Sequence, residues 1–402
     1  MASPAPSPPR ARLGRNVFAL AAVSFLTDVA SDMTYPLLPL FLATTLGASA
    51  TAVGAIEGAA ESVAALLKLG SGWLSDRVRR RKPLVVLGYG IASLIRPLIG
   101  LAQSATQVLA IRVTDRVGKG IRGAPRDALI ADSVDPAIRG RAFGFHRAAD
   151  HAGAMVGPLL SFALLRWGGL ELHQVFLLTA IPGALAVLAV LFGVREVPRE
   201  EDGAARKLDL RAPLGRRFWA FLGVLVLFTL GNSTDAFLLL RARDLGVDAA
   251  LVPILWAVLH VVKSLSSTPG GALSDRIGRK PLLVAGWVLY AAVYFALGRA
   301  DAPWHAWALF AVYGIYFGLT EGVEKALVAD LVPANRRGSA FGWYNLALGI
   351  GALPASLLFG MIWDQAGAPV AFTFGAVMAL TAAVGIAIVA PGRGGFKPLG
   401  NS

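Results

Sequence analysis

Long apolar stretches alternate with short polar segments along the whole chain. Breaks at charged or Pro/Gly clusters separate twelve of them, at 17–42, 52–74, 84–103, 107–130, 142–166, 175–194, 218–240, 250–273, 282–298, 306–328, 339–362 and 369–390. Each stretch is long enough to cross about 30 Å of hydrocarbon as an α-helix. The pattern therefore predicts an all-α integral membrane protein with twelve transmembrane helices.

The amino-acid composition supports a membrane protein and excludes several kinds of functional site. Only 16% of the residues are charged and 55% are hydrophobic, whereas soluble domains contain roughly 25% charged residues. The absence of cysteine excludes disulfides, thiolate metal sites and cysteine nucleophiles. We expect no cofactor and no metal site, because no cluster of His, Asp and Glu has a recognisable metal-ligand spacing.

The net charge of +13 is distributed unevenly along the predicted topology. With both termini on one side, about 24 Lys and Arg residues fall on that side, in the N-terminal segment, the C-terminal tail and the loops at 75–83, 131–141, 195–217, 274–281 and 329–338. About four lie in the opposite loops. This positive-inside pattern predicts cytoplasmic termini, and it explains the charge without a nucleic-acid partner. The high ratio of Arg to Lys is typical of a GC-rich bacterial genome, so we expect a bacterial inner-membrane protein. We expect a monomer in contact with the lipid bilayer.

Two short strings occur twice, in the same order and at nearly the same offset. Gly-Trp-Leu-Ser-Asp-Arg at 72–77 returns as Gly-Ala-Leu-Ser-Asp-Arg at 271–276, and a second string at 131–144 returns with changes at 329–342. Such a repeat indicates a duplicated half. We therefore expect a disordered cytoplasmic N-terminus at 1–16, six-helix halves at 17–194 and 218–391, a cytoplasmic linker at 195–217 and a cytoplasmic tail at 392–402.

These strings resemble the major facilitator superfamily. Its loop signature, Gly-x-Leu-Ala-Asp-Arg-x-Gly-Arg-Lys, matches 271–280 except at Ser274, whereas the first copy has Arg79 where the family has Gly. Residues 116–124 resemble the family's Arg-x-x-Gln-Gly-x-Gly-x-Ala element, with Lys119 in place of Gln. The resemblance implies two pseudo-symmetric six-helix halves in which helices 1, 4, 7 and 10 line a central cavity.

The fifth apolar stretch contains Gly153, Gly157 and Pro158, which are similar to the Gly-x-x-x-Gly-Pro element of proton-coupled exporters in that superfamily. The family's closing Gly-Gly is absent. Small residues four positions apart also let membrane helices approach closely, so helix packing is the alternative interpretation.

Charged residues inside the predicted helices must pair or face water, because each costs roughly 2.5–3.5 kcal/mol at mid-membrane. Asp28/Asp32 and Glu57/Glu61 are i,i+4 pairs on neighbouring helices, and crowding of like charges with desolvation favours a protonated carboxyl group. The acids expected to couple transport to protons are Asp28, Asp32, Glu57, Glu61, Asp115, Asp235 and Glu321. For the cluster of Asp28, Asp32, Glu57 and Glu61, the alternative is that each acid is permanently ionised against an arginine of the fourth helix.

The fourth helix carries a basic stripe, formed by Arg112, Arg116, Lys119, Arg122 and Arg126. The stripe predicts either a structural lattice of salt bridges or a surface that binds an anion. The residues expected to contact substrate are Arg116, Lys119, Arg122, Arg147, Asp150, Lys263, Tyr344 and Asn345. The residues expected to form the cytoplasmic gate and its signature are Gly72, Asp76, Arg77, Arg126, Asp127, Gly271, Asp275, Arg276, Arg279, Glu324 and Lys325.

These features favour a secondary active transporter in which two halves rock about a mid-membrane site and protons drive a small-molecule substrate. Proton-coupled efflux by antiport is the favoured interpretation, and proton-coupled uptake of an anionic or metal-chelate solute is the alternative. A membrane-embedded enzyme is disfavoured, since neither His-Glu-x-x-His nor Gly-x-Ser-x-Gly is present. The duplicated halves with their loop signature also argue against a channel.

Overall fold

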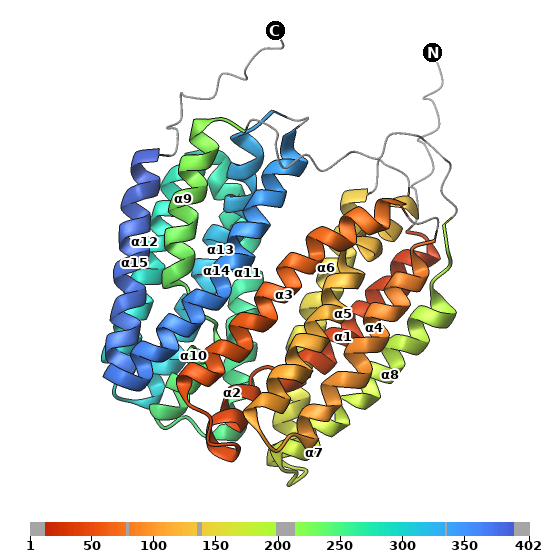
Figure 1. Cartoon of the computed structure of the whole chain (residues 1–402), viewed down its shortest axis with the longest axis horizontal. Helices are drawn as coiled ribbons and strands as arrows, with labels where there is room; N and C mark the ends of the chain where they lie inside the picture. The colour runs from red at the N-terminus through yellow and green to blue at the C-terminus, as the bar shows by residue number, and fades with distance from the viewer. Residues whose placement is uncertain (1–12, 78–79, 135–138, 198–213, 334–335, 390–402) are drawn as a thin grey trace, which may run out of the picture.

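Helices provide the regular secondary structure of the chain in the computed structural model, which describes residues 13–77, 80–134, 139–197, 214–333 and 336–389. They form two bundles that lie side by side, one from each half of the sequence (Figure 1). The predicted all-α fold with two six-helix halves is confirmed. The predicted termini and linker lie largely outside the described residues, at 1–12, 198–213 and 390–402.

The N-terminal half contains six membrane-length segments, some of them broken. They are α1 (Arg15–Thr34) with α2 (Leu38–Leu40) and η1 (Phe41–Thr45), α3 (Ala50–Arg77), α4 (Lys82–Ile95) with η2 (Arg96–Leu101), α5 (Ala105–Asp132), α6 (Arg139–Arg166), and α7 (Leu172–Leu178) with α8 (Ala180–Leu188) and η4 (Ala189–Gly193). Two breaks coincide with Pro36 and Pro97, because proline lacks the amide that continues a helix.

The C-terminal half repeats this arrangement. Its segments are α9 (Arg216–Gly231) with α10 (Ala236–Asp244), η5 (Ala249–Leu251) with α11 (Val252–Ile277), α12 (Arg279–Arg299), α13 (Pro303–Asp330), α14 (Arg337–Ala366) and α15 (Ala368–Val389). Residues 232–235 interrupt the first segment, so Asp235 lies where the helix is broken.

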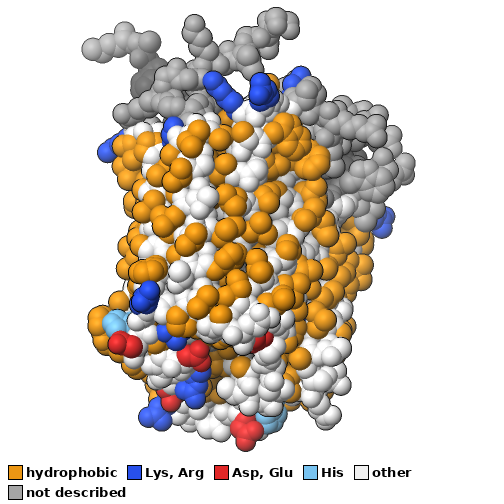
Figure 2. All heavy atoms as spheres, turned by 60° about the vertical axis from the view of Figure 1, so that its left-hand side comes forward, with side chains coloured by type: hydrophobic (Ala, Val, Ile, Leu, Met, Phe, Trp, Pro, Cys, Tyr) orange, Lys and Arg blue, Asp and Glu red, His pale blue; other side chains and the backbone are white. Residues whose placement is uncertain are grey.

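Eleven segments of the described chain are long and apolar enough to cross a membrane. The remaining segment, α5, has 28 residues, but its basic stripe makes it too polar to count as a typical span. Figure 2 shows one face of the molecule as a broad hydrophobic surface with charged side chains gathered toward its two ends. This distribution fits a lipid-facing belt, and the predicted count of twelve is consistent with the structure.

Consecutive segments run in opposite directions, so their connections fall at two ends of the molecule. We call one the basic end; it contains Arg15, Arg81, Lys82, Arg279 and Lys280 and lies at the top of Figure 1. We call the other the opposite end; it contains the connections at 46–49, 102–104, 245–248 and 300–302.

Helices α3 and α14 make the most extensive contact between the two halves. A Cβ atom at Gly54 would lie 2.2 Å from the carbonyl oxygen of Ser356, and one at Gly58 would lie 2.9 Å from a backbone atom of α14. Because only glycine allows these approaches, we call this contact the glycine seam. It runs from the opposite end to Ser62, whose Oγ donates a hydrogen bond to the carbonyl oxygen of Gly349 at 2.5 Å.

Toward the basic end the two bundles diverge (Figure 1). The glycines there lie in open space: an added Cβ at Gly70 of α3, Gly271 of α11 or Gly322 of α13 would meet nothing within 4 Å. The halves are therefore closely packed at the opposite end and apart at the basic end.

Candidate functional site

Helix α5 holds the basic stripe between α3 and α4, which are its main packing partners. The stripe residues follow one another at three or four positions, so they project from one side of the helix. Arg112, Arg116 and Arg122 are buried, whereas Lys119 is exposed. The site therefore combines a buried polar interior with one accessible cation.

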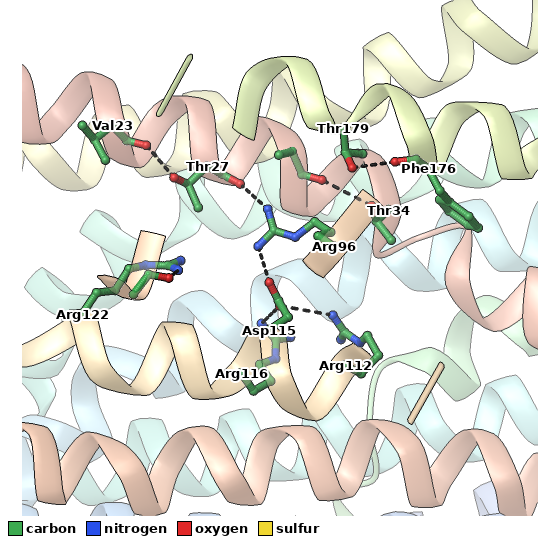
Figure 3. Close-up of polar contacts among 12 residues, drawn as sticks. Val23, Thr27, Thr34, Arg96, Arg112, Asp115, Arg116, Arg122, Phe176 and Thr179 are labelled. Carbon is green, nitrogen blue, oxygen red and sulfur yellow. Dashed lines mark hydrogen bonds and ion pairs between the residues drawn. The ribbon is translucent and has the colours of Figure 1, made fainter. Parts of the chain in front are cut away.

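Three arginines hold three acids of the N-terminal half in ion pairs. Arg112 donates to both carboxylate oxygens of Glu57, at 2.8 and 2.6 Å, and both side chains are buried. Arg96 donates to Asp115 at 2.8 Å and to the carbonyl oxygen of Thr27 at 3.2 Å (Figure 3). The third pair joins Arg116 to Glu61, at 2.9 Å. We call these three pairs the arginine–carboxylate lattice (Arg96–Asp115, Arg112–Glu57 and Arg116–Glu61).

Asp115 lies at the centre of this lattice. Its second oxygen is 3.9 Å from Arg112 and 4.0 Å from Arg116, so three guanidinium groups surround one carboxylate (Figure 3). For Glu57 and Glu61 the geometry supports the alternative that the sequence left open, a fixed pair with an arginine of the fourth helix, over a proton-coupling role. Asp115 is held in a similar way, mainly by Arg96 at the end of α4.

Asp28 and Asp32 on α1 differ from those acids. Within the described part of the chain, neither has a cationic side chain within the 4.0 Å of an ion pair. The charged groups around Asp28 are Asp150, Asp32, Lys119 and Arg122. Asp32 accepts a hydrogen bond from the indole nitrogen of Trp256, at 3.1 Å, and Trp256 belongs to α11 in the other half.

The glycines of the predicted exporter element pack α6 against α1. A Cβ at Gly153 would lie 2.4 Å from the carbonyl oxygen of Phe25 and 3.0 Å from Cβ of Asp28, and one at Gly157 would lie 2.6 Å from the carbonyl oxygen of Val29. Pro158 follows inside the same helix. Close packing, the alternative interpretation of this element, accounts for both glycines and brings α6 next to the unpaired acids.

Two bases of the stripe lack a carboxylate partner among the described residues, Lys119 and Arg122. The guanidinium of Arg122 lies 4.3 Å from the ring centroid of Tyr89 and 3.5 Å from the carbonyl oxygen of Gly88. Stacking on an aromatic ring partly offsets the cost of burying this cation. The unpaired acids of α1 thus lie near two unpaired bases of α5.

The other predicted substrate residues of the N-terminal half lie on α6. Asp150 is buried, 3.5 Å from Arg147 and 3.6 Å from Nδ1 of His146, whereas Arg147 is largely exposed. On α5, Arg126 pairs with its neighbour Asp127 at 2.8 Å. Both groups of contacts stay within the N-terminal half.

In the C-terminal half, acids receive hydrogen bonds from neutral groups. Tyr313 donates to Asp235 at 2.9 Å. Glu324 is buried and accepts from the indole of Trp287 at 3.2 Å and from the hydroxyl of Tyr344 at 3.1 Å. Tyr344, predicted to contact substrate, is thereby oriented toward Glu324.

Glu321, on the same helix as Glu324, pairs with cations instead. It lies 3.1 Å from Lys263 and 3.3 Å from Lys325, and Lys263 also lies 4.2 Å from the ring centroid of Phe317. Glu324 and Lys325, predicted to act together at the gate, therefore have different partners. Asn345 donates to the carbonyl oxygen of Phe341 in its own helix, at 2.7 Å.

At the basic end one ion pair occurs in both halves. Arg81 at the start of α4 pairs with Asp132 at the end of α5, and Arg279 at the start of α12 pairs with Asp330 at the end of α13, at 3.3 Å. The structure thus repeats the duplication seen in the sequence. Of the other signature residues, Arg276 is exposed and Gly271 borders open space. The predictions for Gly72, Asp76, Arg77 and Asp275 concern side chains outside the described residues.

The exposed charges show which side of the site faces water. Glu61, Glu321 and Lys325 are each at least 47% exposed, and Lys119 is exposed as well. All four lie in the middle or basic-end part of their helices. Charged groups at this depth do not face lipid, because lipid exposure is too costly. They face a water-accessible space that opens toward the basic end. The described chain holds no group of three metal-ligating side chains.

Sequence reasoning missed several residues of this site. Arg96 could have been found, since it is the lone charge in a long apolar stretch. Trp256, Trp287 and Tyr313 carried no such signal, because an aromatic residue in a membrane helix is usually a packing or interfacial residue. Their roles depend on contacts between helices far apart in the sequence.

Comparisons with known proteins agree with this architecture. The sequence model of the Major Facilitator Superfamily matches residues 20–262 and 220–397. An uncharacterized MFS-type transporter of Methanocaldococcus jannaschii is 35% identical over 377 residues, covering 92% of this chain and 93% of its own length. The multidrug resistance protein MdtG of Enterobacter lignolyticus is 27% identical over 375 residues, covering 90% and 88%.

Solved structures show the same fold. The nucleoside transporter NupG matches with a TM-score of 0.78 at 15% identity, covering 93% of this chain and 98% of that one. A bacterial homolog of the human lysosomal transporter Spinster, in an inward-facing and unoccupied conformation, matches with a TM-score of 0.72 at 18% identity, covering 93% and 94%. The relatives are transporters rather than enzymes.

Proposed function

We propose that this chain, which belongs to the major facilitator superfamily, is a proton-coupled secondary active transporter that exports a small molecule across the bacterial inner membrane. Asp28 and Asp32 are the proton-carrying groups in this proposal. The basic end is cytoplasmic, with both termini on that side, because Lys and Arg collect there. The structure then represents a state open toward the cytoplasm.

One observation carries the proton assignment: among the described residues, Asp28 and Asp32 of α1 have no cationic partner within ion-pair distance, whereas Glu57, Glu61 and Asp115 have one. An ionised carboxylate inside a membrane protein needs a counter-charge, and where none is in contact the group can instead hold a proton. Asp32 is also hydrogen-bonded to Trp256 of the other half, so movement of the halves changes its surroundings. Asp28 and Asp32 are therefore better placed than Glu57, Glu61 or Asp115 to exchange a proton during the cycle.

The direction of transport rests on the similarity to multidrug resistance proteins, which favours export. A second candidate is favoured by a separate observation, the unpaired bases Lys119 and Arg122. When Asp28 and Asp32 are protonated, these bases leave the N-terminal half with excess positive charge, which attracts an anion. Proton and anion would then bind together and move in the same direction, giving uptake by symport.

The gate belongs to the same proposal. Asp76 and Asp275 of the duplicated signature hold the cytoplasmic ends of the halves together in the state closed to the cytoplasm. Asp76→Asn should impair transport without preventing membrane insertion. If Asp76→Asn transports at the wild-type rate in liposomes, the gating role is wrong and the signature only sets the topology of the loop.

The experiment begins with a ligand-stabilisation screen on purified protein, because a ligand that binds only the folded state raises the melting temperature. The compound found is then followed in proteoliposomes that contain an internal pH dye. In export by antiport, protons cross the membrane in the direction opposite to the compound. In anion symport, protons and compound cross in the same direction. A wild-type protein that carries the compound without any proton movement would refute the coupling.

Asp28→Asn and Asp32→Asn test the carriers in the same assay. At least one of them should abolish drive by a pH gradient and leave exchange of the compound intact. Asp132→Asn is the matched control, since it removes a carboxylate outside the predicted gate that already pairs with Arg81. If both single variants and their double variant keep the wild-type pH dependence, the assignment to α1 is wrong.

A further inference from the structure

We propose that Asp364 is a positioning residue for alternating access, whose carboxylate holds the opposite end closed by capping the first turn of a helix in the other half. Asp364 belongs to α14 in the C-terminal half. Its two carboxylate oxygens accept hydrogen bonds from the backbone amides of Ala50 and Thr51, at 2.9 and 2.8 Å. These are the first two residues of α3 in the N-terminal half. We call this contact the α3 cap.

The α3 cap supplies acceptors that α3 itself lacks. The first four amides of a helix have no partner within the helix. In α3, Ser49 serves the third and fourth: its Oγ accepts from Ala52 at 3.2 Å and its carbonyl oxygen accepts from Val53 at 3.1 Å. The amides of Ala50 and Thr51 bond to Asp364 instead. A negative charge at this position is further favoured by the partial positive charge of the helix N-terminus.

The glycine seam places Asp364 over the start of α3. Gly360 lies one helical turn before Asp364 and so faces the same side of α14. A Cβ at Gly360 would lie 2.6 Å from the carbonyl oxygen of Ala50 and 2.7 Å from Cα of Thr51. The close approach of the two backbones therefore brings the carboxylate of Asp364 within hydrogen-bond distance of the first amides of α3.

The same chemistry occurs within one half at the basic end. The two carboxylate oxygens of Glu196 accept from the amides of Arg81 and Lys82, each at 3.0 Å, at the start of α4. Glu196 follows the last segment of the half that contains α4, at the start of the predicted linker, so this cap need not break when the halves rock. The α3 cap joins the two halves and must break before the opposite end can open. The α3 cap thus stabilises the state in which the opposite end is closed. In the proposal above, Asp76 has the corresponding role at the basic end.

The absence of cysteine from the chain provides a direct assay. Ser356 is buried in the glycine seam beside Gly54, so a single Ser356→Cys reacts with a water-soluble maleimide only when the seam opens. In lipid nanodiscs without substrate or pH gradient, we expect Asp364→Ala to raise this reaction rate about fivefold, the effect of a typical lost helix cap. Asp364→Asn, which keeps one acceptor oxygen, should give a smaller increase. Melting temperature is recorded for each variant.

Glu196→Ala is the matched control, because it removes an equivalent two-oxygen cap without touching the contact between the halves. It should leave the reactivity at position 356 unchanged. Gly360→Ala is the second variant: it forces the seam apart while retaining the carboxylate, and it should also raise the rate. An increase in Gly360→Ala with none in Asp364→Ala would show that packing alone closes this end. An equal increase in Asp364→Ala and Glu196→Ala would indicate general loosening, and either result overturns the proposal. Because no proton or substrate is involved, its failure is separate from that of the transport proposal.

Discussion

The two halves share one fold but neutralise their buried acids differently. In the N-terminal half, arginines hold acids of α3 and α5, although not Asp28 and Asp32 of α1: Arg112 holds Glu57 with two hydrogen bonds, and Arg96 holds Asp115. In the C-terminal half, tyrosine and tryptophan donate to Asp235 and Glu324. A duplicated backbone therefore fixes where polar groups lie, while the side chains decide whether a site carries fixed charge.

The difference has an energetic consequence. An ion pair inside a protein is sensitive to the loss of either partner, because the remaining charge stays buried without compensation. A carboxyl group that accepts from neutral donors loses less when it becomes an amide of the same shape. We therefore expect the N-terminal half to be the more sensitive to charge removal, and each prediction below tests or refines that expectation.

The largest effect is expected at the pair of Arg112 and Glu57. Arg112→Met leaves Glu57 buried and unpaired, which should lower the free energy of unfolding by about 3–5 kcal/mol. The measurement is the apparent melting temperature and the monodisperse fraction of purified protein. The charge-free double variant Arg112→Met/Glu57→Gln should recover most of the loss. Wild-type stability in the single variant would show that the lattice is not a structural element.

A smaller loss is expected for Arg116, whose partner Glu61 is about half exposed and therefore partly solvated. Arg116→Ala should cost about 1 kcal/mol in stability, after allowance for this solvation, and it should also lower substrate affinity and transport rate. The double variant Arg116→Ala/Glu61→Ala should restore stability but not transport. Full transport by the charge-free pair would instead make Arg116 structural.

In the C-terminal half, Glu324→Gln should cost about 1 kcal/mol or less, since the amide oxygen can keep one of the two hydrogen bonds. Tyr344→Phe removes only one donor to the same carboxylate and is the matched control, with a similar or smaller loss. Melting temperatures measured beside those of the Arg112 variants give the contrast. If Glu324→Gln loses as much stability as Arg112→Met, the two halves do not differ in their sensitivity to charge removal.

The sequence predicted the architecture well and the partners only in part. Twelve apolar stretches and the repeated signature were sufficient for the two-half fold, because hydrophobic length and duplication are local signals. The basic stripe of α5 was visible for the same reason. Which acid each arginine meets depends on helix rotation and crossing, so the pairing of Arg116 with Glu61 and the isolation of Asp28 needed coordinates. Asp364 was missed because its function lies in contacting a helix about 314 residues away.

The smallest effect is expected where the two halves are most alike. Arg81 pairs with Asp132 and Arg279 pairs with Asp330 at equivalent positions of the basic end, and both acids are more than a third exposed. Exposed ion pairs contribute about 0–1 kcal/mol, so Asp132→Asn and Asp330→Asn should each change stability by less than about 1 kcal/mol, and by similar amounts. Melting temperatures of the two single variants and the double variant check this, and the double variant should show additive losses because the pairs lie in different halves. A clearly larger loss for Asp132→Asn would mean that the arginine-based stabilisation of the N-terminal half extends to the basic end, and that the repeated pair is alike in position but not in energy.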